Sequence, residues 1–213
     1  MKSPAHIFLD LDGPLLDGKE RHYFCYQHIL KASAHTPLEI EQYWESKRSR
    51  GDRRDLLKMS GAEDLYASFL TAWLSLIESP EALALDKVQA GAIEQLTGWQ
   101  DRGINLVLVT MRKQRRALDA QLKALKLRPL LNAVLICGHA EGGRGKAEVV
   151  QDFCPNASLA GSTVWVGDTE VDLEAAQSLG CRIVLISNGL RNEAYLRSLN
   201  GAVVVPSIAS VDL

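Results

Sequence analysis

The chain has few cysteines and no close pair of them. Among 213 residues there are four, Cys25, Cys137, Cys154 and Cys181, and no two are separated by only two residues. Zinc sites and redox pairs use closely spaced cysteines, so we expect neither here. We interpret the four as free thiols, mostly buried, in a reducing compartment.

Signals for a membrane or for nucleic acid are also lacking. No apolar run approaches about 18 residues. The residues before Asp10 show no basic region followed by an apolar stretch, so we expect no secretory signal. The net charge is -2, and no face or tail is strongly basic, which argues against nucleic acid as a partner. A content of 46% hydrophobic and 23% charged residues fits a soluble globular chain. We expect a cytoplasmic protein, which is either a monomer or a homodimer.

Strands and helices alternate through most of the chain. Apolar runs predict strands at 5–10, 104–110, 132–136, 163–166, 182–186 and 202–205, and helical spacing predicts helices at 113–126, 145–153, 170–179 and 191–199. Strands that are apolar on both faces and alternate with helices indicate a parallel sheet with right-handed crossovers. The predicted fold class is therefore α/β, with a doubly wound parallel sheet.

The stretch from residue 19 to about 86 has a different pattern, which is mostly helical. It is divided into about four helices by breaks at Thr36-Pro37, Ser49-Arg50-Gly51, Ser60-Gly61 and Ser79-Pro80. A loop of this length inside a compact domain is improbable unless it folds as its own unit. We therefore predict a helical cap domain at 17–87, inserted in a catalytic core formed by 1–16 and 88–213. The insert follows Asp12 closely, so we expect it to stand over the carboxyl edge of the sheet.

The first predicted strand ends in two carboxylates. In the run Ile7-Phe8-Leu9-Asp10-Leu11-Asp12-Gly13, a strand would place Asp10 and Asp12 on the same side. Open α/β sheets bind ligands at this carboxyl edge. Two like charges there repel each other unless a cation or a proton lies between them. The pair suits a metal-assisted reaction in which one carboxylate attacks and the other moves a proton.

Later strand ends add polar groups at the same edge. One predicted strand ends at Thr110, another is followed by Asp168, and Asp172 comes four residues after that. Ligand sets made of oxygen alone favour Mg²⁺, which takes one or two carboxylates together with a substrate phosphate. Lys146, near the start of a predicted helix, supplies a positive charge that could hold the nucleophile and the phosphoryl oxygens together.

These motifs resemble those of the haloacid dehalogenase-like hydrolase superfamily, in its phosphatase branch with a helical cap after the first motif. Four motifs occur in the family's order: Asp10-Leu11-Asp12-Gly13, then Thr110, then Lys146, then Gly167-Asp168-Thr169-Glu170-Val171-Asp172. The resemblance covers essentially the whole chain. It implies a phosphatase that acts on a small phosphorylated metabolite, such as a sugar phosphate or phosphoglycolate.

The resemblance also implies a role for each matching residue. Asp10 would be the nucleophile that forms an aspartyl-phosphate, and Asp12 the general acid and then base. Thr110 and Lys146 would bind the phosphoryl oxygens. Mg²⁺ would be held by Asp10, by the backbone carbonyl of Asp12 and by Asp168. Asp172 would be a further ligand or would orient the others.

Three arginines are candidates for contact with substrate. Arg112 follows Thr110 closely enough to touch it. Arg50 and Arg54, in Arg50-Gly51-Asp52-Arg53-Arg54, resemble the substrate-facing loop of some capped sugar-phosphate phosphatases and mutases. Guanidinium groups bind anions through two parallel hydrogen bonds. The segment that contains Arg50 and Arg54 is explained equally well as the basic start of a helix that is exposed to solvent.

Two departures from the family pattern keep alternatives open. Pro14 stands where the family often has Thr or Val, and Gly18 where it has Ser or Thr. Neither replaces the nucleophile, the acid/base or a metal carboxylate. These departures leave open a binding or regulatory protein that retains the fold with little activity. The nearest enzymatic alternative, which would keep the same residues, is a mutase of the β-phosphoglucomutase type.

Overall fold

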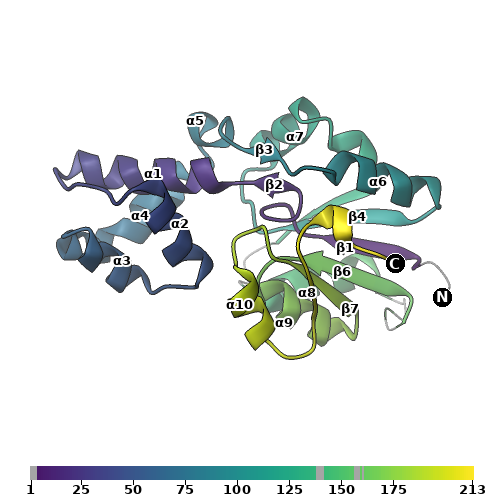
Figure 1. Ribbon diagram of the computed structural model, residues 1–213. Coiled ribbons are helices and arrows are strands. Elements are labelled where there is room, and N and C mark those ends of the chain that lie inside the picture. Colours follow the sequence, from purple (N-terminus) through teal and green to yellow (C-terminus); the bar gives the residue numbers. More distant parts are fainter. Residues whose placement is uncertain (1–3, 138–141, 156–158, 160) are drawn as a thin grey trace. The chain divides into compact units, whose positions relative to one another are not determined.

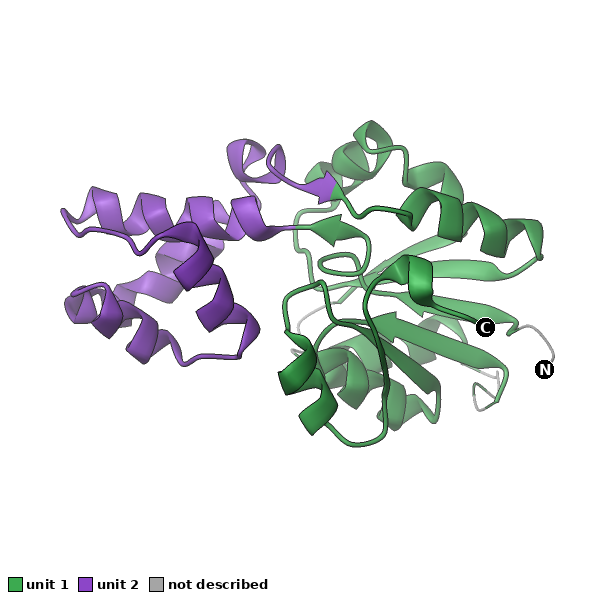
Figure 2. Cartoon of the chain, viewed as in Figure 1, with its two compact units in different colours: residues 1–17, 88–213 green, residues 18–87 purple. Residues whose placement is uncertain are grey.

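The computed structural model describes residues 4–137, 142–155, 159 and 161–213, and the chain divides into two compact units (Figures 1 and 2). Unit 1 comprises residues 1–17 and 88–213, and unit 2 comprises residues 18–87. The first boundary lies one residue later than the one that we placed from the sequence. Among the described helices, none combines the length and the apolar character that crossing a membrane requires.

Unit 1 is built on a six-stranded sheet in the order β5-β4-β1-β6-β7-β8. Its strands are β1 (His6–Leu9), β4 (Asn105–Thr110), β5 (Ala133–Ile136), β6 (Thr163–Gly167), β7 (Arg182–Ile186) and β8 (Val203–Val205). Each neighbouring pair runs parallel. The predicted α/β class with a parallel sheet is therefore confirmed.

Helices cover both faces of this sheet, because successive strand residues point to opposite sides. Ile7 and Leu9 of β1 face a core that includes buried residues of α6 (Ala92–Asp101), α7 (Arg115–Ala124) and η3 (Ile208–Ser210). Phe8 faces the other core, with buried residues of α8 (Gly142–Phe153), α9 (Glu170–Leu179) and α10 (Glu193–Ser198). A short turn, η2 (Arg128–Leu130), precedes β5.

The strand order places a topological switch beside β1. From β1 the chain proceeds outward through β4 and β5 on one side, and then through β6, β7 and β8 on the other. The loops that leave β1 and β6 therefore run in opposite directions and open a crevice at their carboxyl ends, which is where open α/β sheets bind ligands. Asp10 directly follows β1 and Asp168 directly follows β6.

Some predicted boundaries were wrong near this crevice. The first strand ends at Leu9, although the Asp10 N–H still donates to the Val166 carbonyl at 3.0 Å. The chain then enters a turn in which Gly13 has a φ of +104°, so the alternation of a strand does not extend to Asp12. In this turn Gly13, Leu15 and Leu16 donate backbone hydrogen bonds, so proline at position 14 removes none of them.

The described part of unit 2 is mostly helical. The chain enters and leaves it through two short strands, β2 (Leu16–Asp17) and β3 (Lys87–Val88), which form a two-stranded sheet that the sequence did not indicate. Its helices are α1 (Lys19–Ala32), α2 (Ile40–Arg48), α3 (Arg53–Met59), η1 (Glu63–Leu65), α4 (Tyr66–Leu76) and α5 (Pro80–Leu83). Four of them exceed a single turn in length, and α5 and η1 are short additions.

A buried ion pair joins the beginning of unit 2 to its end. Arg21 Nε lies 2.7 Å from Asp86 Oδ1, and the two side chains are 2% and 0% exposed. A Cβ at position 18 would lie 3.2 Å from the Arg21 guanidinium and 3.3 Å from His22. A side chain at this position would therefore require these neighbours to shift by a few tenths of an ångström.

Candidate active site

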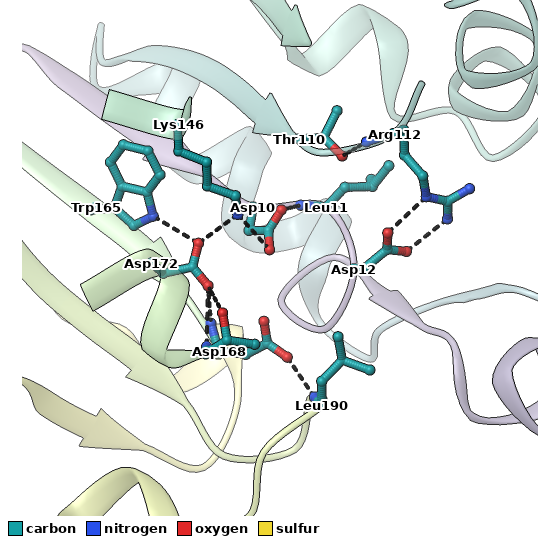
Figure 3. Close-up of polar contacts among 11 residues, drawn as sticks. Asp10, Leu11, Asp12, Thr110, Arg112, Lys146, Trp165, Asp168, Asp172 and Leu190 are labelled. Atoms are coloured by element: carbon teal, nitrogen blue, oxygen red, sulfur yellow. Dashed lines mark hydrogen bonds and ion pairs between the residues drawn. The ribbon is translucent and has the colours of Figure 1, made fainter. Parts of the chain in front are cut away.

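Asp10 lies against a buried lysine at the carboxyl end of β1. Its Oδ2 is 2.8 Å from Nζ of Lys146, and its Oδ1 accepts the Leu11 N–H at 2.8 Å (Figure 3). Lys146 is only 1% exposed and reaches this point from α8. Burial by itself lowers the pKa of a lysine, but here the two neighbouring carboxylates, Asp10 and Asp172, outweigh that effect and raise the pKa of Lys146.

Both carboxylate oxygens of Asp172 accept hydrogen bonds from neighbouring groups. Its Oδ1 accepts from Lys146 Nζ at 2.7 Å and from Trp165 Nε1 at 3.2 Å. Its Oδ2 accepts from the backbone of Asp168 and Thr169, both at 3.1 Å, and from the Thr169 hydroxyl at 2.8 Å. The bond from the Thr169 N–H belongs to the capping box that begins α9. Five donors on its two oxygens therefore fix the position of the Asp172 carboxylate.

Asp168 is held differently, with one oxygen bound and one not. Its Oδ2 accepts the Leu190 N–H at 2.5 Å, whereas Oδ1 is buried without a hydrogen-bond partner among the described residues. A Cβ on Gly13 would lie 2.0 Å from this carboxylate, and one on Gly189 would lie 2.2 Å from it. Both glycines therefore let the backbone approach Asp168 closely.

Asp10, Asp168 and Asp172 form a compact cluster of carboxylates. One oxygen of each lies within 4.8 Å of the others, and all three residues are buried. Burial raises the pKa of Asp10 to about 7, against the opposing effect of Lys146. Burial, and then the charges of Asp172 and Asp10, raise the pKa of Asp168 well above its ordinary value. One lysine for three carboxylates, together with the unbound Oδ1 of Asp168, fits a site for a divalent cation.

The side chain of Asp12 faces a different cation from that of Asp10. Arg112 Nε donates to Asp12 Oδ2 and Arg112 Nη2 to Asp12 Oδ1, each at 2.7 Å (Figure 3). The side chain of Asp12 is also absent from the carboxylate cluster. Thr110, which is 1% exposed, ends β4 next to this pair, and its Oγ1 accepts the Arg112 N–H at 3.3 Å.

The comparisons with known proteins agree with this architecture. The family model described as haloacid dehalogenase-like hydrolase matches residues 7–186. The chain belongs to this family. No curated protein matches it.

Several solved structures share the fold across almost the whole chain. A predicted phosphatase from Clostridium acetobutylicum has a TM-score of 0.72 at 16% identity, covering 97% of this chain and 95% of that one. A predicted phosphoglycolate phosphatase from Haemophilus somnus has a TM-score of 0.73 at 18% identity, covering 98% and 96%. A protein provisionally named a β-phosphoglucomutase, from Thermotoga maritima, has a TM-score of 0.67 at 19% identity, covering 96% and 94%. At these identities the likeness shows the fold alone.

In this haloacid dehalogenase-like hydrolase, two of the residues that we predicted to bind substrate lie in unit 2. Arg50 is exposed in the turn after α2, with a φ of +57°. Arg54 is exposed at the start of α3, where Asp52 caps the helix by accepting the Arg54 N–H at 2.6 Å. The Arg54 guanidinium lies over the ring of Tyr66, 4.2 Å from its centroid. Such stacking holds the planar cation at the surface while leaving its N–H donors at the rim available.

Sequence reasoning missed three contacts to the carboxylates. They come from Trp165 Nε1, the Leu190 N–H and the Arg112 guanidinium. The Thr169-x-x-Asp172 spacing could have indicated the capping box, because a hydroxyl three residues before a carboxylate is typical of a helix start. Arg112 was assigned to substrate, whereas the structure places it on Asp12.

Proposed function

We propose that the protein is a Mg²⁺-dependent phosphomonoesterase that works through an aspartyl-phosphate on Asp10. The ion pair of Asp10 with the buried Lys146, at the switch point of the sheet and within the carboxylate cluster, is the observation that carries this proposal. A carboxylate is a weak nucleophile in water, and it attacks well only where neighbouring positive charge holds both it and the phosphoryl group. Membership of the hydrolase family supports this chemistry.

The reaction has two steps in this proposal. In the first, an Asp10 oxygen attacks phosphorus, the bond from phosphorus to the ester oxygen breaks, and Asp12 gives its proton to the leaving oxygen. In the second, water attacks the phosphorus of the aspartyl-phosphate and gives a proton to Asp12. The bond to Asp10 then breaks and phosphate leaves. Lys146 and Thr110 bind the phosphoryl oxygens in both steps, and the two transfers return Asp10 and Asp12 to their starting states.

The residues that would hold Mg²⁺ are Asp10, Asp168 and the backbone carbonyl of Asp12, with Asp172 as an orienting group. When bound, the ion would neutralise the charge that develops on the phosphoryl oxygens. The Oδ1 of Asp168, buried without a hydrogen-bond partner in the described part of the chain, supports this assignment. Oxygen ligands and room for a substrate phosphate favour Mg²⁺ over softer metals.

The test is release of inorganic phosphate by the purified protein. We expect hydrolysis of an aryl phosphate that requires Mg²⁺ and stops in EDTA, and phosphate on Asp10 after an acid quench, located by mass spectrometry. A screen of phosphorylated sugars and of phosphoglycolate would then identify the substrate. No phosphate release with any ester would contradict the proposal. Isomerisation of a sugar phosphate without release would favour the mutase, since the fold is shared by phosphatases and by the Thermotoga maritima protein alike.

Unit 2 is proposed as the cap that selects the substrate, through Arg50 and Arg54. We expect Arg54→Ala to raise KM for the physiological substrate about 10- to 150-fold, because a charge-assisted contact is worth about 1.5–3 kcal/mol. Hydrolysis of a small aryl phosphate should change little, since that compound offers nothing beyond its phosphoryl group. Lys58→Ala, an exposed cation on the same helix, is the matched control. Equal losses on both substrates would contradict a role for Arg54 in selection.

A further inference from the structure

We infer that Arg112 is a positioning residue, which fixes the carboxylate of Asp12 for its two proton transfers, and that it does not bind the substrate. This inference rests on the proposed function, because it needs Asp12 to act as acid and base. It concerns a residue that lies beyond the four motifs and that sequence reasoning assigned to substrate.

The geometry of the pair is that of a fork on a carboxylate. Arg112 Nε and Nη2 each donate to a different oxygen of Asp12, both at 2.7 Å. Two parallel N–H···O bonds restrict rotation of the carboxylate plane as well as its position. Each carboxylate oxygen has a second lone pair, so the fork leaves Asp12 able to carry or accept a proton on its outer side.

Burial makes this contact a fixed one. The Arg112 side chain is 5% exposed and that of Asp12 is 20% exposed, which contrasts with the exposed side chains of Lys113, Arg115 and Arg116. Arg112 also precedes α7, which begins at Arg115 and not at 113 as the sequence predicted. Its N–H donates to Thr110 Oγ1 at 3.3 Å, which ties the base of the side chain to the end of β4.

The turn that carries Asp12 explains why such a support is needed. Asp12 lies beyond the end of β1, in a segment held by a bridge to Leu16 and followed by Gly13 at a φ of +104°. No ladder of neighbouring strands fixes a side chain there, whereas Asp10 is held by the Val166 carbonyl and by Lys146. Arg112, which follows β4, the strand next to β1, fixes the Asp12 carboxylate through these two bonds. Misplacing an acid/base group by a fraction of its hydrogen-bond length slows both transfers.

The experiment is a double-mutant cycle on an aryl phosphate in saturating Mg²⁺. We expect Arg112→Ala to lower kcat about 10- to 100-fold, the range found when a group that orients a functional residue is lost, with KM changed less than about threefold. Arg112→Lys should recover little of the loss, because an ammonium cannot donate two parallel bonds in one plane. In an Asp12→Asn background, Arg112→Ala should cost less than about twofold further, since it acts only through Asp12.

The control is Arg116→Ala, an exposed cation on α7, which should match the wild type. Steady-state turnover should be slow in the Asp12→Asn background. The rate at which Asp10 is phosphorylated in a single turnover is therefore measured there to complete the cycle. A rise in KM of similar size in both backgrounds would place Arg112 on the substrate and overturn the inference. Additive losses in kcat would overturn it as well. Absence of phosphate release by the wild-type protein would contradict the proposed function itself, which separates the two failures.

Discussion

Asp10→Asn is expected to lower kcat by about 10³-fold or more, because it removes the proposed covalent nucleophile. The amide keeps the shape of the side chain and can still accept the Leu11 N–H, which Oδ1 of Asp10 accepts at 2.8 Å. It cannot attack phosphorus as a carboxylate does. Steady-state phosphate release and mass spectrometry of the quenched protein measure the effect, and the quenched variant should carry no phosphate on residue 10.

The control is Asp101→Asn, which neutralises an exposed carboxylate at the end of α6 in the same unit. It should retain wild-type kcat. The Asp10→Asn variant should show a cooperative thermal unfolding transition, so that the loss of kcat cannot be attributed to a loss of structure. A kcat within about threefold of the wild type, with a folded variant, would show that Asp10 does not carry the phosphoryl group.

Asp168→Asn should abolish activation by Mg²⁺ and at the same time stabilise the metal-free protein at neutral pH. Asp168 is fully buried, and its Oδ1 has no hydrogen-bond partner among the described residues. Its pKa is raised well above the ordinary value, first by burial and then by Asp172 and Asp10. The unbound oxygen that would hold a cation is therefore a cost to the fold when no cation is bound.

The sign of the pH dependence follows from these raised values. A carboxyl whose pKa is higher in the folded state adds stability below its ordinary pKa, near 3.9, and loses it as pH rises through the folded value. For Asp10 that value is about 7. In EDTA, the contribution of Asp10 to the free energy of unfolding should therefore fall between about pH 4 and pH 7.

Thermal melts in EDTA at several pH values measure the effect. At pH 8 the Asp168→Asn variant should be more stable than the wild type, because it removes one of three clustered carboxylate charges. Mg²⁺ should raise the Tm of the wild type and leave that of the variant unchanged. Asp101→Asn should follow the wild type in both respects. Two results would contradict a role for Asp168 in the metal site. One is a lower Tm for Asp168→Asn than for the wild type in EDTA, and the other is a rise in the Tm of the variant with Mg²⁺ as large as that of the wild type.

The sequence by itself determined the fold class and the positions where polar groups meet. Apolar runs between helical segments specify a parallel sheet, because only strands buried on both faces read in that way. Residues that directly follow such strands share one edge, so the proximity of Asp10 and Asp168 followed from chain order. The start of α9 was also readable, because the Thr169-x-x-Asp172 capping box acts over three residues.

What only the tertiary structure decided is the partner of the other carboxylates. The sequence indicated Lys146 for Asp10, but not that Lys146 also pairs with Asp172 or that Arg112 pairs with Asp12 across 100 positions of sequence. No local pattern encodes such a choice, because it depends on where β1 stops and on how the turn around Gly13 directs the following side chain. The bond from the Leu190 N–H to Asp168 is of the same kind, since it arises from the close approach that glycine at 189 allows.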